Sequence, residues 1–180
     1  MTHWQPAASM QQIRKRAELY RLIREFFGQR QVMEVDTPVL SAAAVSDPYL
    51  QPMQTNYTGP GQADGLNLYL QTSPEYPMKR LLVAGSGPIY QLARVFRNGE
   101  SGSRHNPEFS MLEWYRPGFD DHKLMDEVAA LVQLTTGCGK SAKLSYRELF
   151  QQHLNFDPHR ATASDLKIVA EQQLDLSADL

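Results

Sequence analysis

Residues 95–115 have the sequence VFRNGESGSRHNPEFSMLEWY, and this stretch indicates the fold more clearly than any other part of the chain. Apolar and β-favouring residues dominate 89–97, and 108–115 alternates between two faces in the manner of a strand. The polar segment between them, 99–106, contains glycine and indicates a loop. Two alternating segments joined by a short polar loop predict an antiparallel hairpin.

The side chains around the predicted loop suit a phosphorylated ligand. Arg97 closes the first strand, and residues 104–106, Arg-His-Asn, end the loop. An arginine guanidinium can hold a phosphate through two parallel hydrogen bonds. Phe109 could stack on a base, which contributes about 1–3 kcal/mol in nucleic-acid sites. Glu113 could hold an ammonium group or a metal ion, although an exposed hairpin with solvated charges fits the same composition.

The complete string from Phe96 to Tyr115 resembles motif 2 of the class II aminoacyl-tRNA synthetases, in the form used by the lysyl branch. It is most similar to the family of lysyl-synthetase paralogues that ligate (R)-β-lysine onto elongation factor P. The resemblance covers about 4–157 and implies an α+β fold, a class II synthetase-like catalytic domain with an antiparallel sheet flanked by helices. We expect this domain to span 1–180 and to be incomplete, with motif 1 near 14–38, motif 2 near 89–115 and motif 3 absent.

Bulk properties agree with one globular domain. The chain has 180 residues, 42% of them hydrophobic, and a net charge of −2. A single cysteine, Cys138, excludes an internal disulfide and fits a cytoplasmic location. No stretch resembles a membrane span or a signal peptide, so no membrane partner is expected. The near-neutral charge argues against a broad nucleic-acid surface.

The N-terminal region predicts a helix followed by a short strand. Ser9 and Gln12 form a capping-box signal for a helix over 10–30, and 32–35 is a candidate strand that ends before Pro38. The apolar stripe of this helix consists of Ile13, Ala17, Tyr20, Ile23 and Phe27. The arrangement resembles class II motif 1, which forms the dimer interface in that superfamily, and so implies a homodimer.

Further elements are predicted on both sides of the hairpin. Residues 49–57 indicate an edge strand interrupted by Pro52, and 66–70 indicates a strand with one buried face. Helices are expected after caps at Asp120 or Asp121, at Ser145 and at Thr162. The first of these helices should direct inward Leu124, Val128, Leu131 and Val132.

Residues 73–75, Ser-Pro-Glu, carry a second part of the resemblance. Ser73 can cap a helix that has Pro74 at its first position, and Pro77 should distort or delay the start of that helix. In the family this string lies in the substrate loop, which implies that Ser73, Pro74 and Glu75 bind the substrate, with Glu75 facing an ammonium group. Tyr115 matches a substrate-contacting tyrosine.

The resemblance also implies the chemistry of ATP activation. A substrate carboxylate attacks the α-phosphate of ATP and yields an adenylate and pyrophosphate, and Arg97 is the catalytic residue that holds this phosphate. Positioning and electrostatics, rather than a nucleophile or a proton shuttle, would drive the reaction. The expected ATP contacts are Arg97, Asn98, Gly99, His105, Asn106 and Phe109. Gly99 stands where the family has glutamate; either Glu100 substitutes for it or ATP affinity falls.

Motif 3 and the late carboxylates that hold Mg²⁺ in the family have no counterpart in this sequence. No metal ligand is therefore assigned, and Mg²⁺ is expected to bind outside these residues. We expect the chain to be the N-terminal part of a longer enzyme and to be unable to form an adenylate alone.

The predicted motif 1 helix leaves no room before it for the anticodon-binding domain of a lysyl-tRNA synthetase. This favours the ligase, with ATP, a lysine-like amino acid and elongation factor P as partners, over tRNA. Two alternatives stay open: a catalytic-core fragment of a lysyl-tRNA synthetase, and an inactive nucleotide-binding or dimerisation remnant. The sequence does not distinguish (R)-β-lysine from lysine as substrate.

Overall fold

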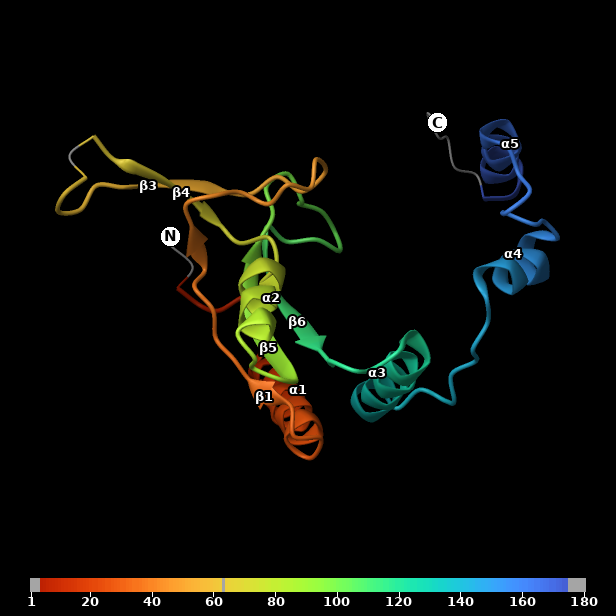
Figure 1. Cartoon of the computed structure of the whole chain (residues 1–180), viewed down its shortest axis with the longest axis horizontal. Helices are drawn as coiled ribbons and strands as arrows, with labels where there is room; N and C mark the ends of the chain where they lie inside the picture. The colour runs from red at the N-terminus through yellow and green to blue at the C-terminus, as the bar shows by residue number, and fades with distance from the viewer. Residues whose placement is uncertain (1–3, 63, 175–180) are drawn as a thin grey trace. The chain divides into compact units, whose positions relative to one another are not determined.

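The computed structural model describes residues 4–62 and 64–174, with side chains described up to 172. The chain divides into two compact units, Met1–Cys138 and Gly139–Leu180, and each is described by itself. In chain order the first unit contains α1 (Met10–Gly28), β1 (Met33–Glu34), β2 (Leu40–Ser41), β3 (Gln54–Tyr57), β4 (Leu66–Leu70), α2 (Glu75–Val83), β5 (Ile89–Phe96), β6 (Glu108–Tyr115) and α3 (Asp121–Thr136) (Figure 1).

The hairpin predicted from residues 95–115 and their neighbours is present as β5 and β6. The two strands pair antiparallel over their whole length, from Ile89 opposite Tyr115 to Phe96 opposite Glu108. β1 adds to the other edge of β5 in parallel, with Met33 opposite Ile89, so the sheet order is β1-β5-β6. The expected antiparallel sheet is therefore wrong in one respect, because a parallel pair is part of it.

A second sheet has the order β2-β4-β3 and is antiparallel throughout. β3 lies at its edge, as predicted, but it covers only Gln54–Tyr57 and begins after Pro52. The prediction of a buried face on β4 is wrong, since each of its residues is exposed or half-buried. Figure 1 shows the reason: the ribbon of β3 and β4 projects from the rest of its unit instead of lying under a helix.

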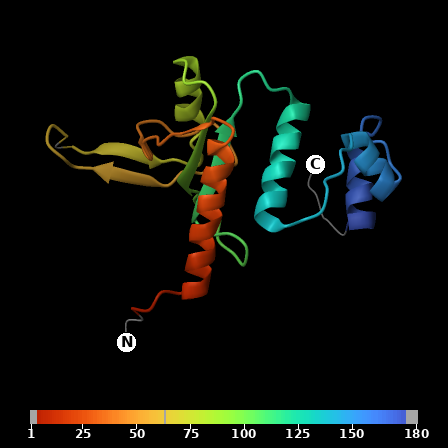
Figure 2. The same ribbon diagram turned by 90° about the horizontal axis from the view of Figure 1, so that it is seen from below.

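The core of the first unit lies on one face of the β1-β5-β6 sheet, under α1 and α3. Its buried residues are Ile23, Phe26, Phe27, Val32, Tyr90 and Leu131. Phe27 is completely buried; its ring stacks on Tyr90 with centroids 4.4 Å apart and contacts Trp114 at 5.5 Å. α1 and α3 run side by side in Figure 2, and both contribute to this cluster.

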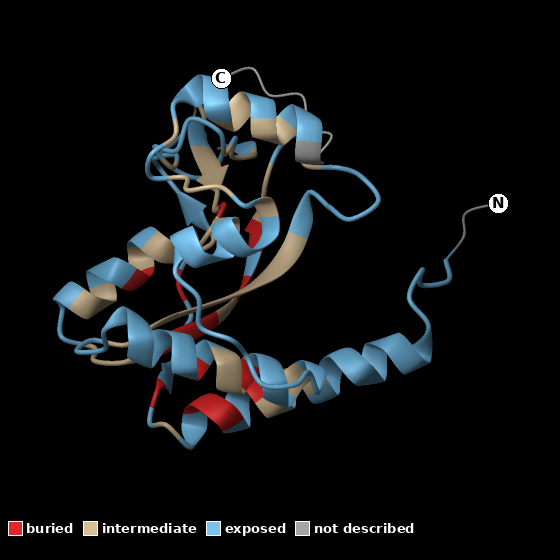
Figure 3. Ribbon diagram, turned by 90° about the vertical axis from the view of Figure 1, so that its right-hand side faces the viewer, coloured by how far each residue is buried: buried red, intermediate tan, exposed pale blue. Residues whose placement is uncertain are grey.

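The predicted capping box of α1 is confirmed. The Ser9 hydroxyl accepts a hydrogen bond from the Gln12 backbone N–H at 3.2 Å, and the Gln12 side chain accepts one from the Ser9 N–H at 2.8 Å. Only the last part of the helix is buried, however, and its N-terminal half is exposed (Figure 3). Ile13, in that half, is exposed. The predicted apolar stripe is thus buried by this chain from Ile23 onward.

The start of α3 follows the predicted signal. Asp120 caps the first turn by accepting a hydrogen bond from the Lys123 N–H at 2.8 Å, and Gly137 ends the helix with a left-handed φ of 69°. The predicted inward face is wrong except at Leu131, since the other three residues are exposed: Leu124, Val128 and Val132. The helix instead turns Glu127 inward.

Buried Glu127 is held by groups from the neighbouring strand and loop. Trp114 donates its indole N–H to Glu127 Oε2 at 3.1 Å, and Arg116 Nε lies 3.4 Å from the same oxygen. Arg30 Nε lies 3.8 Å from the other carboxylate oxygen. A buried carboxylate needs such partners to offset the loss of hydration, and these partners determine which side of α3 faces the sheet.

The second unit contains α4 (Tyr146–Leu154) and α5 (Ala163–Leu174). The predicted cap at Ser145 is confirmed, and Ser145 and Glu148 form a capping box through two reciprocal hydrogen bonds, at 3.2 Å and 2.7 Å. Thr162 caps α5 together with Asp165, also as predicted. Over the whole described part of the chain, the helices are too short or too polar to cross a bilayer.

Candidate functional site

The face of the β5–β6 hairpin opposite the α1 core carries the predicted site residues. Strand alternation places Phe109, Glu113 and Tyr115 together on this face, while Trp114 points to the core. The long loop between the strands lies at one end of the face. The first turn of α2 lies beside the other end, where Ser73 contacts Glu113.

The loop between β5 and β6 surrounds a pocket of about 600 Å³, here called the loop pocket. It is lined by Arg97, Gly99, Glu100, Ser101, Arg104, His105, Asn106 and Phe109. Every expected ATP contact is in this lining except Asn98. The backbone N–H of Asn98 donates to the carbonyl of Gln51 at 2.8 Å, so this residue anchors the loop to the preceding segment.

Arg97 is held in the loop pocket from several sides. Its Nε donates to the carbonyl of Thr72 at 3.4 Å, and its guanidinium carbon lies 5.2 Å from the centroid of the Phe109 ring. One terminal nitrogen lies 3.5 Å from a carboxylate oxygen of Glu100. The backbone N–H of Arg97 donates to Pro107 at 3.0 Å and closes the loop. The guanidinium is therefore positioned before any ligand binds.

Gly99 has a φ of 81°, and a Cβ atom built on it would meet nothing within 4 Å. Space is available for a side chain, but a left-handed backbone disfavours any residue other than glycine. The glycine at this position therefore permits a tight turn that brings Glu100 back toward Arg97.

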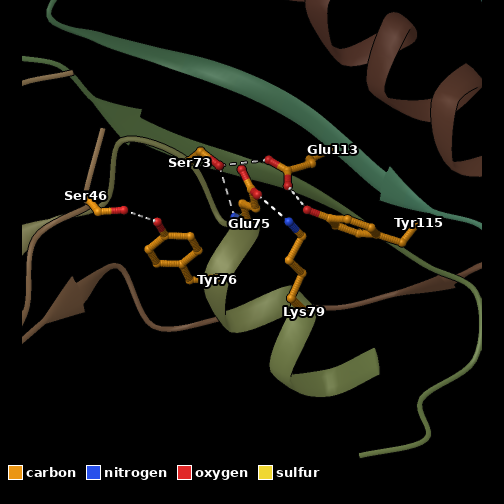
Figure 4. Close-up of polar contacts among 7 residues, drawn as sticks. All are labelled: Ser46, Ser73, Glu75, Tyr76, Lys79, Glu113 and Tyr115. Carbon is orange, nitrogen blue, oxygen red and sulfur yellow. Dashed lines mark hydrogen bonds and ion pairs between the residues drawn. The ribbon is translucent and has the colours of Figure 1, made fainter. Parts of the chain in front are cut away.

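At the other end of the same face, five residues form what we call the acidic cluster: Ser73, Glu75, Lys79, Glu113 and Tyr115 (Figure 4). The Ser73 hydroxyl donates to Glu113 Oε2 at 3.0 Å, and the Tyr115 hydroxyl donates to Glu113 Oε1 at 2.5 Å. Both carboxylate oxygens of Glu113 are thus fixed by hydroxyl groups.

Ser73 was predicted to be the N-cap residue of α2 but stands one position before it. α2 begins at Glu75, and its N-cap residue is Pro74, whose side chain is apolar. Ser73 instead accepts a hydrogen bond from the Glu75 N–H at 3.0 Å and donates to Glu113. Pro77 fits the first turn because backbone N–H groups there have no partner within a helix, and the expected delay of the helix amounts to one residue.

Tyr115 is a hydrogen-bond donor for electrostatic as well as geometric reasons. Burial of its ring, together with the hydrogen bond to Glu113, raises the pKa of Tyr115 well above its usual value. The Tyr115 hydroxyl therefore stays protonated and acts as the donor.

Glu75 already has an ammonium partner, which belongs to the chain itself. Lys79, one helical turn later, places its Nζ 2.5 Å from Glu75 Oε1. The hydrogen bond to Glu75, and to a smaller extent the charge of Glu113, raises the pKa of Lys79. Figure 4 shows the Lys79 side chain directed toward Glu75, with Glu113 close by.

Neither Lys79 nor the contact between Ser73 and Glu113 was predicted from the sequence. The capacity of Glu113 to hold an ammonium group was predicted. Two spacings in the sequence could have indicated these contacts. Glu75 and Lys79 are one helical turn apart, and Glu113 and Tyr115 are two residues apart on one face of a strand. Ser46 is also linked to this region, because its hydroxyl lies 2.8 Å from the Tyr76 hydroxyl (Figure 4).

The two ends of the face have opposite chemical character. Arg97, Arg104 and His105 supply cationic or hydrogen-bonding groups suited to phosphates. Glu75 and Glu113 supply carboxylates suited to an ammonium group. Within the described residues, His, Cys, Asp and Glu side chains do not gather in groups of three or more that could hold a metal ion.

Comparison with known proteins matches residues 2–164 to the model of the tRNA synthetases class II (D, K and N). The chain is 55% identical over 169 residues to the elongation factor P–(R)-beta-lysine ligase of Vibrio campbellii, covering 94% of the chain and 52% of the relative. The corresponding ligase of Pectobacterium atrosepticum is 53% identical over 171 residues, 95% of the chain and 53% of the relative. That of Yersinia pestis is 55% identical over 174 residues, 97% of the chain and 53% of the relative.

The chain spans about half the length of these curated relatives. The family model, in contrast, covers most of the chain, including both the loop pocket and the acidic cluster. The agreement of this match with the confirmed hairpin leads to one conclusion: the chain belongs to the family of class II tRNA synthetases (D, K and N).

Proposed function

We propose that this chain forms the ATP- and amino-acid-binding part of a ligase that activates (R)-β-lysine, or lysine, and transfers it to a lysine of elongation factor P in the cytoplasm. The observation that carries the proposal is the pairing of a cationic pocket with an acidic cluster on one strand face. Phe109 and Glu113 are four residues apart on β6, which corresponds to about 13 Å at 3.3 Å per residue. One ligand with phosphates at one end and an amine at the other would fit this spacing.

The proposed roles follow the charges. ATP would place its adenine on Phe109 and its α-phosphate on Arg97, with His105 and Asn106 at the loop end. Gly99 would contact ATP through its backbone, and Asn98, whose N–H is bonded to Gln51, through its side chain. The amino acid would place its ammonium group at Glu75 and Glu113, next to Ser73, Pro74 and Tyr115. Its carboxylate would then point along the strand toward Arg97.

The reaction proposed for the ligase has two steps. A carboxylate oxygen of the amino acid bonds to the α-phosphorus of ATP while the bond to pyrophosphate breaks, and Arg97 stabilises the charge that gathers on the phosphate. The acceptor amine then bonds to the acyl carbon, AMP leaves, and a proton is released to solvent. Ligases of this class use ATP with Mg²⁺ in general, and the chain's own contribution is to bind and orient the two reactants.

The names of the relatives support elongation factor P as acceptor and (R)-β-lysine as substrate. Because the chain spans about half the length of those proteins, the decisive test measures ligand binding rather than catalytic turnover. Purified chain would be titrated with ATP, with elongation factor P and with lysine tRNA. Binding of ATP and elongation factor P supports the ligase. Preference for the tRNA would favour a lysyl-tRNA synthetase, and binding of ATP without either macromolecule would favour a nucleotide-binding remnant.

Glu75→Gln should weaken binding of (R)-β-lysine or lysine by about 10- to 100-fold, because a hydrogen bond to a charged group contributes on the order of 1.5–3 kcal/mol. Calorimetry in the presence of ATP would measure the change. Glu25→Gln is a matched control, since Glu25 is also ion-paired and half exposed but lies on α1. Equal affinities in the Glu75 and Glu25 variants would contradict the placement of the amine.

We also propose a homodimer formed through α1. Support comes from the exposed apolar residues Met10 and Ile13 on the half of α1 that the core does not cover. Analytical ultracentrifugation of the purified chain should then show a dimer at micromolar concentration, and Ile13→Asp should shift it toward monomer. A strict monomer across that concentration range would contradict this interface.

A further inference from the structure

The carboxylate of Glu100 lies inside the loop pocket, on the residue that the proposed function assigns to the phosphate. Glu100 Oε1 is 3.5 Å from a terminal nitrogen of Arg97, and the side chains are 32% and 22% exposed, respectively. The other contacts of Arg97 described above are a carbonyl oxygen and an aromatic ring, neither of which carries a net charge. The negative charge next to Arg97 is therefore that of the Glu100 carboxylate.

The local backbone explains how Glu100 reaches Arg97. The two residues are three positions apart, and residues 98 and 99 between them form a turn. Gly99 has a left-handed φ of 81°, which some four-residue β-turns require at their third residue. A side chain at 99 would strain this backbone. Gly99 and Glu100 therefore act together: the glycine allows the turn, and the turn places the Glu100 carboxylate next to Arg97.

We propose that Glu100 sets the affinity of the pocket for phosphorylated ligands by occupying Arg97 until a phosphate displaces it. This inference rests on the proposed ATP site and goes beyond it by naming a competing group within the chain. A phosphate and a carboxylate are both anions, so they repel one another when both approach one guanidinium. Glu100 must leave, and its departure lowers the net affinity for nucleotides. A ligand without phosphate, such as adenosine, does not need Arg97 and is unaffected.

Glu100→Gln tests the inference, because it removes the charge and retains the shape of the side chain. Calorimetric titrations with ATP, AMP and adenosine should show roughly fivefold tighter binding of ATP, the scale expected for one partly exposed ion pair. AMP carries the phosphate assigned to Arg97 and should gain by a similar factor, whereas adenosine should bind with unchanged affinity. Glu100→Ala should also tighten ATP binding. Alanine cannot form the hydrogen bond to Arg97 that the glutamine could retain, so this variant tests the loss of the contact as well as of the charge.

Glu108→Gln is the matched control on the same hairpin. Glu108 lies 3.6 Å from Arg94, outside the loop pocket, and its replacement alters the net charge by the same amount. This variant should leave ATP affinity unchanged. A long-range effect of net charge would instead change ATP affinity equally in the Glu100 and Glu108 variants, so the control distinguishes that effect from competition at Arg97.

Two results would overturn the inference while leaving the ATP site intact. Weaker ATP binding in Glu100→Gln would mean that the carboxylate contacts the nucleotide favourably, and equal binding in the Glu100 and Glu108 variants would mean that it does not compete. If neither the unmodified chain nor any variant binds ATP, the proposed function itself fails, and the inference fails with it.

Discussion

Arg97→Ala should weaken ATP binding by at least about 100-fold, the scale expected when a partly buried charge loses its ionic partner. Arg97 is held over Phe109 and beside Thr72, so its guanidinium meets the phosphate without first being ordered. Isothermal calorimetry with ATP on the unmodified chain and on the variant would measure the difference. Saturable binding that is lost in the variant would establish the hairpin as a working nucleotide site.

Arg94→Ala is the control for this experiment. Arg94 lies on β5, three residues before Arg97, and pairs with Glu108 on the hairpin, but it does not line the loop pocket. Its replacement removes the same charge and should change ATP affinity by less than about threefold, as expected for an exposed ion pair. Equal losses in the two variants would show that only the overall charge of the hairpin matters.

Phe27→Ala should lower the free energy of unfolding of the first unit by about 3–5 kcal/mol, because it removes a completely buried ring and leaves a cavity. The ring contacts Tyr90 and Trp114, which belong to the two strands of the hairpin. Loss of this packing therefore loosens the strands that carry Arg97 and Glu113. Urea denaturation followed by tryptophan fluorescence would measure the change.

Val83→Ala serves as the comparison for Phe27, since Val83 on α2 is 90% exposed and its truncation should cost less than about 0.5 kcal/mol. A loss below about 1 kcal/mol in Phe27→Ala would contradict the assignment of the α1 cluster as the core.

Local patterns in the sequence predicted those features that depend on neighbouring residues. Alternation was sufficient for the hairpin, and side-chain caps were sufficient for the starts of α1, α3 and α4. The lining of the loop pocket was also largely predictable, because its residues follow one another in a single loop and the string has a strong family resemblance.

Contacts between distant segments were less accessible. Ser73 has the local signature of a helix cap, and its hydroxyl accepts the Glu75 N–H, but the hydrogen bond that it donates to Glu113 spans 40 positions and has no local signal. The apolar spacing of α3 gave the wrong face because buried Glu127 pairs with Arg116 and Trp114. The alternation of β4 indicated an amphipathic strand, but no local pattern states whether another element covers it.

The strict alternation of β6 constrains how this chain can change in length over evolution. Glu113 faces the acidic cluster, and the next residue, Trp114, faces the core. Deleting or inserting one residue within the strand would exchange these directions, bringing a carboxylate against Phe27 and an indole against Ser73. Insertions and deletions should therefore be confined to the loop between β5 and β6, where altered length changes the pocket without inverting the two faces of the hairpin.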